Sequence, residues 1–197
     1  MPIAIRPWMV LCGVLFLGGL LAGCSYEQAF PRTPIGQIEV KERPPARILC
    51  TQSKGDFFAQ KDDLFRTLYH YIDVREVEMT VPVAAQIDPA AMVFFLGDKD
   101  ASRSLRDSRR VQVMNLPGLL VASAGARGGY SRGNFEETER LLRAWVNLNP
   151  EYKPADKAYA VFWDGPYTLW FLKRYEVHMP VERADSDSGS ADSEPVP

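Results

Sequence analysis

The residues best able to do chemistry in this 197-residue chain gather near its C-terminal end, in DGPYTLWFLKRYEVHMPVE at residues 164–182. This run combines aromatic side chains, two adjacent cations, several carboxylates and one of only two histidines. A neutral imidazole such as that of His178 can bind a metal, and a carboxylate such as that of Glu176 can neutralise a cation or activate water. We expect this stretch to be a closing strand of the fold whose aromatic lead-in borders a groove.

Strand alternation decides which of these side chains share a face. It places Lys173 on one face and Arg174, Glu176 and His178 on the other. Glu176 and Arg174 could form a buried carboxylate with its counter-ion, or an exposed pair that adds almost nothing to stability. His178 could ligate an iron centre, or could be a surface or second-layer histidine hydrogen-bonded to a neighbour. Trp170 could belong to a stacking surface or to the core.

Other sequence signals for catalysis are weak. His70 is turned away from the apolar stripe of a predicted helix, so we expect it in solvent. Cys50 has no CxxC partner and is expected to be a small buried side chain. The sequence has no GxSxG, no HExxH and no glycine loop with dinucleotide spacing. We therefore predict a binding protein that is not an enzyme.

The first residues predict export and lipid attachment. Arg6 precedes an apolar run at residues 9–22 that is too short to cross a hydrocarbon core of about 30 Å comfortably. The LLAGC sequence ending at Cys24 resembles a bacterial lipobox, which implies cleavage of a signal peptide at residues 1–23 and lipid on the Cys24 sulfur. An uncleaved membrane anchor is the alternative. Ser25 favours the outer membrane of the cell envelope if two membranes are present.

The rest of the chain divides by composition. Residues 184–197 carry acidic side chains without a cation and lack large apolar ones, which predicts a disordered acidic tail. Residues 24–36, with two prolines, are predicted to be a tether. Residues 37–183 are long enough to form one domain with a full core. The formal net charge of −2 and the lack of a basic face argue against nucleic acid as a partner.

Apolar periodicity predicts strand–strand–helix–strand–strand twice. One helix carries Leu64, Leu68 and Ile72, and a polar loop at residues 98–110 separates the halves. The second helix is expected to begin at Asn134 with a capping box. Its predicted apolar face is Leu141, Leu142, Trp145 and Leu148. The predicted strands are residues 37–43, 46–52, 77–84, 91–97, 110–116, 119–126, 158–163 and 170–181.

This order predicts an α+β domain in which two duplicated halves form a curved, mostly antiparallel sheet with two helices. Pro82 should confine its strand to a sheet edge or a bulge, because proline cannot donate to a ladder. A curved sheet leaves a concave face on which a ligand can lie.

Four segments in this order resemble the SOUL family of haem-binding proteins. They are FRTLYHYI at residues 65–72, MTVPV at residues 79–83, FFL at residues 94–96, and Gly165-Pro166 followed by Arg174-x-Glu176-Val177. Tyr175 and Gly97 depart from the family pattern, which more often has Asn and Pro there. The resemblance implies the duplicated fold, which GyrI-like effector domains share, and binding of a tetrapyrrole.

We therefore predict a membrane-tethered, non-catalytic protein that binds haem or another planar tetrapyrrole. Lys173 and Arg174 could pair with propionates, and His178 is the candidate iron ligand. One alternative is sequestration or hydrolysis of a small, cationic xenobiotic with Glu176, and another is an interaction scaffold without a small ligand. The candidate ligand-binding residues are Tyr69, Met79, Trp170, Lys173, Arg174 and Glu176.

Overall fold

The computed structural model describes residues 26–184. The predicted signal peptide, Cys24 and the acidic tail beyond residue 184 lie outside these residues. Within residues 26–184 no helix combines the length and the apolar character needed to cross a membrane.

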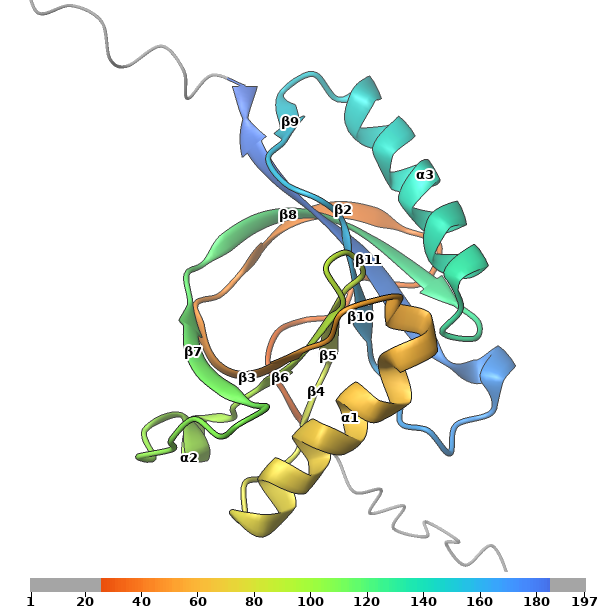
Figure 1. The fold of residues 1–197 in the computed structure, drawn as a ribbon. Coiled ribbons are helices and arrows are strands. Elements are labelled where there is room, and N and C mark those ends of the chain that lie inside the picture. The colour runs from red at the N-terminus through yellow and green to blue at the C-terminus, as the bar shows by residue number, and fades with distance from the viewer. Residues whose placement is uncertain (1–25, 185–197) are drawn as a thin grey trace, which may run out of the picture.

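A single antiparallel sheet of nine strands curls into a half-barrel (Figure 1). Its order is β2-β8-β11-β10-β5-β6-β3-β7, and β9 pairs with the far end of β11. A separate short parallel pair joins β1, Glu27–Gln28, to β4, Thr80–Val81. The strands of the large sheet are β2 Ile38–Arg43, β3 Ala46–Gln52, β5 Val83–Gln86, β6 Ala91–Phe95, β7 Gln112–Leu116, β8 Leu119–Arg127, β9 Tyr152–Pro154, β10 Tyr159–Phe162 and β11 Arg174–Arg183.

The predicted α+β class and the duplicated order of elements are confirmed, and the two halves exchange a strand. The first strand of each half pairs with the second strand of the other half, because β2 lies against β8 and β7 lies against β3. Strands β5 and β10 join the halves at the centre of the sheet. The sheet is therefore continuous across both repeats.

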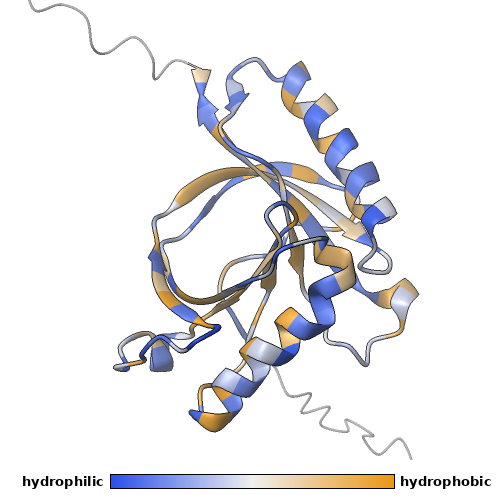
Figure 2. Ribbon diagram, viewed as in Figure 1, coloured by the Kyte–Doolittle hydropathy of each residue, from blue (hydrophilic) through white to orange (hydrophobic). Residues whose placement is uncertain are grey.

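Both long helices, α1 (Phe57–Val74) and α3 (Arg132–Leu148), lie on the same side of the sheet (Figures 1 and 2). The predicted stripe on α1 is confirmed, because Leu64, Leu68 and Ile72 are buried. Burial of this stripe against the sheet, at about 25 cal/mol per Å² of apolar surface, stabilises the helix far more than propensity does.

The predicted start and apolar face of α3 are wrong in part. The N-cap is Ser131, whose hydroxyl accepts a hydrogen bond from the Asn134 N–H at 3.3 Å. Leu142 is buried as predicted, but Leu141 and Leu148 are exposed because the helix is rotated. The side chains that α3 buries are Phe135, Thr138, Leu142 and Val146.

Several predicted boundaries also need correction. A short helix, α2 (Asp98–Ala101), lies within the predicted polar loop. The strand predicted at residues 77–84 is interrupted at Pro82, and β5 after it is an interior strand between β10 and β6. Pro82 is accommodated because it lies between β4 and β5, where no backbone N–H is needed for a hydrogen bond in either strand pairing. The closing strand starts at Arg174, four residues later than predicted, after a 3-10 turn at Trp170–Leu172.

The face of the sheet away from the helices has its own apolar cluster, and residues 26–36 lie across it. Phe30 is 5% exposed and packs edge-on against Phe95 and Trp163, with ring centroids 5.4 and 5.8 Å apart. The tether prediction is therefore wrong for residues 26–36, which are part of the fold. Cys50 is buried in this cluster, as predicted.

Candidate functional site

A buried polar cluster surrounds Glu176 on the concave face of the sheet, which is the face away from the helices (Figure 1). Glu176 itself is completely buried. Its Oε2 atom accepts hydrogen bonds from Lys41 Nζ at 2.9 Å, from Ser123 Oγ at 2.9 Å and from His178 Nε2 at 2.6 Å. Its Oε1 atom accepts one from the Thr33 backbone N–H at 2.8 Å. The carboxylate is thus surrounded by donors of this same chain.

The electrostatics of the cluster favour an ionised Glu176 and a neutral His178. Burial opposes ionisation of Glu176, but the His178 hydrogen bond and the charge of Lys41 outweigh it and lower the pKa of Glu176 to about 2. Burial lowers the pKa of His178 more than its contact with Glu176 raises it. The second ring nitrogen, Nδ1, lies 3.1 Å from the hydroxyl of Tyr159.

The N-terminal segment covers this cluster and restricts its chemistry. The Thr33 hydroxyl lies 2.7 Å from that of Ser123 and accepts from Lys41 at 2.8 Å. Gly125 makes the close approach possible, because a Cβ there would lie 2.3 Å from the carbonyl oxygen of Pro34. Glu176 therefore stabilises the fold, and its position does not support the predicted alternatives in which it binds an external cation or activates water.

The loop between β10 and β11 is exposed and apolar, in contrast to the buried polar cluster around Glu176. Its eight residues, 165–172, have the sequence GPYTLWFL and carry no charge. Tyr167 is 99% exposed and Trp170 70% exposed. The other large exposed apolar side chains of the loop are Leu169, Phe171 and Leu172.

Both ends of this loop are fixed to the sheet. Asp164 accepts hydrogen bonds from the backbone N–H of Arg174 at 2.6 Å and from its Nε at 2.9 Å. Burial would raise the pKa of Asp164, but these bonds and the guanidinium charge outweigh it and lower it. The Tyr130 hydroxyl lies 3.0 Å from the carbonyl oxygens of both residues. The exposed side chains therefore stand on a base that is joined to the sheet by hydrogen bonds.

An aromatic and cationic surface adjoins the loop near the start of α3. Tyr130 stacks on Phe162 with ring centroids 4.2 Å apart, and Lys173 Nζ lies 4.9 Å from the Tyr130 ring centroid. Trp170 borders Gly129, whose Cβ, if present, would lie 3.9 Å from that of the tryptophan. Phe162 is buried and Tyr130 partly buried, so the exposed Trp170 ring beside Lys173 is the part that can contact a flat apolar ligand with acidic groups at its edge.

The structure brings together only some of the predicted site residues. Trp170, Lys173 and Arg174 lie at the loop, and Arg174 pairs with Asp164 instead of Glu176. Glu176 is joined to His178 and Lys41 inside the half-barrel.

The remaining predicted residues lie elsewhere. Met79 packs partly buried against the main core. Tyr69 is half exposed on α1 and stacks on Phe65, and His70 beside it is exposed as predicted. The lipidation residue, Cys24, lies outside residues 26–184.

Sequence reasoning missed Lys41, Thr33 and Tyr130. For Lys41 a signal existed, because alternation in QIEVKER puts its side chain and that of Glu39 on one face, opposite Ile38 and Val40. No local pattern indicates that this polar face turns inward. Tyr130 lies in a glycine-rich segment of the sequence, and its contacts at the base of the β10–β11 loop are made with residues 34 and 44 positions away, which no local pattern indicates.

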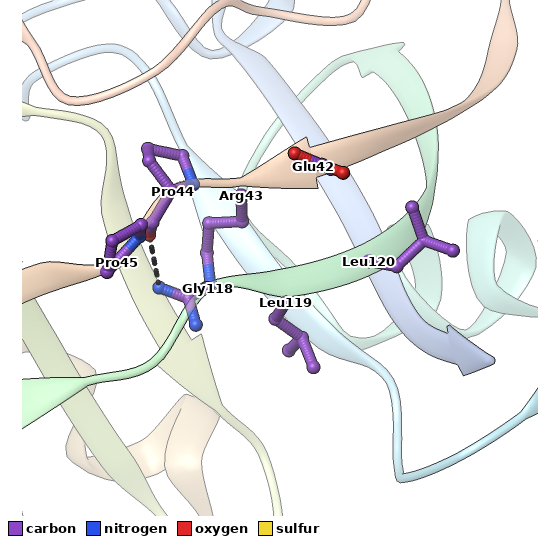
Figure 3. Close-up of a pocket in the computed structure, with 7 residues that line it drawn as sticks. All are labelled: Glu42, Arg43, Pro44, Pro45, Gly118, Leu119 and Leu120. Atoms are coloured by element: carbon purple, nitrogen blue, oxygen red, sulfur yellow. Dashed lines mark hydrogen bonds between the residues drawn. The ribbon is translucent and has the colours of Figure 1, made fainter.

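A shallow depression of about 310 Å³ lies at the other end of β8 (Figure 3). Arg43 lines it and donates hydrogen bonds to the carbonyl oxygens of Pro44 at 3.3 Å and Pro117 at 2.7 Å. Arg43 thus holds two turns together. The depression contains none of the predicted site residues; it is lined by Glu42, Arg43, Pro44, Pro45, Gly118, Leu119 and Leu120.

Solved structures share this fold at low sequence identity. The crystal structure of the EcmrR C-terminal domain has a TM-score of 0.60 and 13% identity, over 75% of this chain and 98% of that domain. EcmrR in a DNA complex also has a TM-score of 0.60, with 14% identity over 75% of this chain, which spans 57% of that protein. A hydrolase from Listeria innocua has a TM-score of 0.52 and 13% identity, over 76% of this chain and 94% of that one.

Sequence comparison identifies the family directly. No curated protein matches the chain significantly. Residues 25–180, most of the chain, match the family described as SOUL heme-binding protein. This match includes residues 26–36, which the structure also places within the fold. The chain therefore belongs to the SOUL haem-binding family.

Proposed function

We propose that this protein binds haem or another planar tetrapyrrole without changing it chemically, while lipid on Cys24 holds it at the membrane of a bacterial cell envelope. Membership of the SOUL family supports the class of ligand. The lipobox-like sequence supports the anchor, and Ser25 favours the outer membrane of a cell that has two.

One observation carries the position of the site: the exposed, uncharged loop at residues 165–172 stands on a base fixed by Asp164 and Arg174. Soluble folds rarely expose such a contiguous apolar surface unless it contacts a ligand or a partner. A porphyrin has a broad apolar face. Burying it at roughly 25 cal/mol per Å² can supply several kcal/mol without a metal bond.

The side chains beside the loop fit the two parts of such a ligand. Trp170 and Phe171 would contact the apolar face, and Lys173 would pair with a propionate. His178 is completely buried and both of its ring nitrogens have partners, which argues against it as the iron ligand. We therefore expect apolar contact to dominate, so that metal-free protoporphyrin binds within a few-fold of haemin.

The test is a titration of haemin and of protoporphyrin into the full chain, followed by absorbance in the Soret region. Trp170→Ser should weaken both ligands roughly tenfold, equivalent to about 1.4 kcal/mol. Leu148→Ser is the matched control, because Leu148 is 81% exposed at the distant end of α3. It should leave both affinities unchanged, and both variants should keep wild-type stability within about 0.5 kcal/mol.

Two results would contradict the proposal. A wild-type chain that gives no saturable Soret change does not bind these tetrapyrroles, which leaves the interaction scaffold. Equal affinities for wild type and Trp170→Ser would place the ligand away from the loop.

A further inference from the structure

The start of the fold and the apolar loop project from the same end of the sheet. In the β5–β10 ladder Phe162 lies opposite Val83, so the chain that follows Phe162 passes the end of β5 at which β4 lies. In the β1–β4 pair Glu27 lies opposite Thr80, so Tyr26 is at this end too. Figure 1 shows β4 and the loop after β10 in the same lower part of the fold.

The side chains at this end are of the types that occur where lipid meets water. Tyrosine and tryptophan are enriched at membrane interfaces, because a ring can lie among the headgroups with its polar tip in water. Tyr26 is 55% exposed, and Tyr167, Leu169 and Trp170 are exposed at the tip of the loop. The loop itself carries no charge that would oppose insertion.

Cations surround the base of the loop. Lys173 and Arg127 lie on adjacent backbones, because the Gly128 N–H donates to the Lys173 carbonyl at 2.8 Å. Arg32 lies with its guanidinium carbon 6.0 Å from the ring centroid of Trp163. Asp164, a carboxylate at this base, is paired with Arg174, and Glu27, next to Tyr26, accepts a hydrogen bond from the Asp98 N–H at 2.9 Å. Basic side chains next to apolar ones favour a surface of anionic lipid.

We propose that the loop at residues 165–172, together with Tyr26, is a membrane-docking surface that inserts into the headgroup region of an anionic bilayer. Only Ser25 separates Tyr26 from Cys24. A lipid on Cys24 would thus hold this end of the sheet within roughly 10 Å of the bilayer, at about 3.5 Å per residue. The docking surface shares Trp170 and Lys173 with the proposed ligand site, so a tetrapyrrole bound beside the loop would lie at the lipid surface.

The experiment reconstitutes the full chain, without tetrapyrrole, into phosphatidylcholine–phosphatidylglycerol vesicles with brominated acyl chains, which quench inserted tryptophan. Subtracting the fluorescence of Trp170→Phe from that of wild type isolates Trp170 from the other tryptophans. We expect the Trp170 signal to be blue-shifted and to lose most of its intensity. An unquenched Trp170 signal would overturn the proposal, whether the loop is in solvent or against a protein.

A second variant separates insertion from simple proximity to the anchor. Combined Tyr167→Ser and Leu169→Ser substitutions leave Trp170 in place but remove the apolar tip, and should lower the quenching several-fold. Leu148→Ser, on α3, should change nothing. Equal quenching in wild type and the double variant would mean that the loop does not insert. A chain that binds porphyrin but fails this test would keep its proposed function and lose only the docking surface.

Discussion

The loop at residues 165–172 and strand β11, Arg174–Arg183, are neighbours in sequence and opposites in environment. The loop exposes five large apolar side chains to solvent. The strand buries a carboxylate and an imidazole, Glu176 and His178, without any exposure. Residue type would predict the reverse, since apolar side chains are usually inside and charged ones outside.

This contrast separates the side chains that hold the fold from those that remain available for contact with other molecules. The exposed loop contributes little to stability, because its apolar side chains gain nothing from burial within the chain, so its composition is available for a ligand or a lipid surface. The cluster around Glu176 has every oxygen occupied by donors of the chain, including the N–H of Thr33. Its charges contribute to the stability of the fold and to the docking of residues 26–36.

The largest expected effect is the loss of stability when a buried phenylalanine ring is removed. Phe30→Ala should lower the free energy of unfolding by about 3–5 kcal/mol, since it leaves a cavity beside Phe95 and Trp163. Phe171→Ala, the same change in the loop, should cost less than about 1 kcal/mol because that ring is half exposed. Denaturant unfolding of both variants measures the difference. Equal losses of unfolding free energy in the two variants would contradict the difference in burial between Phe30 and Phe171.

A smaller effect is expected for Glu176→Gln. It leaves the largely buried Lys41 without its closest carboxylate and should cost about 3 kcal/mol. Glu39→Gln is the matched control, because Glu39 is 3.8 Å from Lys41 and partly exposed, and should cost at most about 1 kcal/mol. Porphyrin affinity should be unchanged in both. If Glu176→Gln abolished porphyrin binding in a folded chain, the cluster would belong to the site.

The smallest expected effect is the fall in the free energy of unfolding as the pH is lowered. A carboxyl group whose pKa is lower in the folded state stabilises above its unfolded pKa, and that contribution is lost as the pH falls. Folding lowers the pKa of Glu176 from 4.5 to about 2. The free energy of unfolding should therefore fall by about 2 kcal/mol by pH 3. His178, whose pKa is also lowered, should add a loss that begins below about pH 6.5.

Comparing unfolding curves from pH 7 to pH 3 with those of Glu176→Gln isolates the Glu176 contribution. The variant should show a shallower fall below pH 4.5. Parallel curves for the two proteins would contradict the lowered pKa of Glu176.

Periodicity predicted the element types well, even for β11, which is buried on both of its faces. The stripe of Leu64, Leu68 and Ile72 on α1 and the alternation along β2 and β11 are local patterns set by backbone geometry. The prediction was wrong for part of the face of α3. Leu142 and Trp145 pack against the core as predicted, whereas Leu141 and Leu148 are exposed, because a helix with several leucines can be rotated without losing its amphipathic pattern.

The positions of the candidate residues were predicted only in part, and their roles in binding stay predictions. Trp170 and Lys173 were identified from residue type, and both lie at the loop. The pairing of Arg174 with Asp164 could not be preferred over Glu176, because alternation says which side chains share a face and nothing about a turn ten residues away. Two of the four hydrogen-bond partners of Glu176 are far away in the sequence, Thr33 by 143 residues and Lys41 by 135.

The sequence by itself determined the α+β class, the repeated order of elements and the family, because these depend on periods of two and 3.6 residues and on short local motifs. Only the tertiary structure decided that the halves exchange β2 and β7, that residues 26–36 cover the concave face, and that Glu176 is buried while Trp170 is exposed. Those outcomes depend on contacts between distant segments. Their free energy comes from burial and hydrogen bonding that no local pattern records.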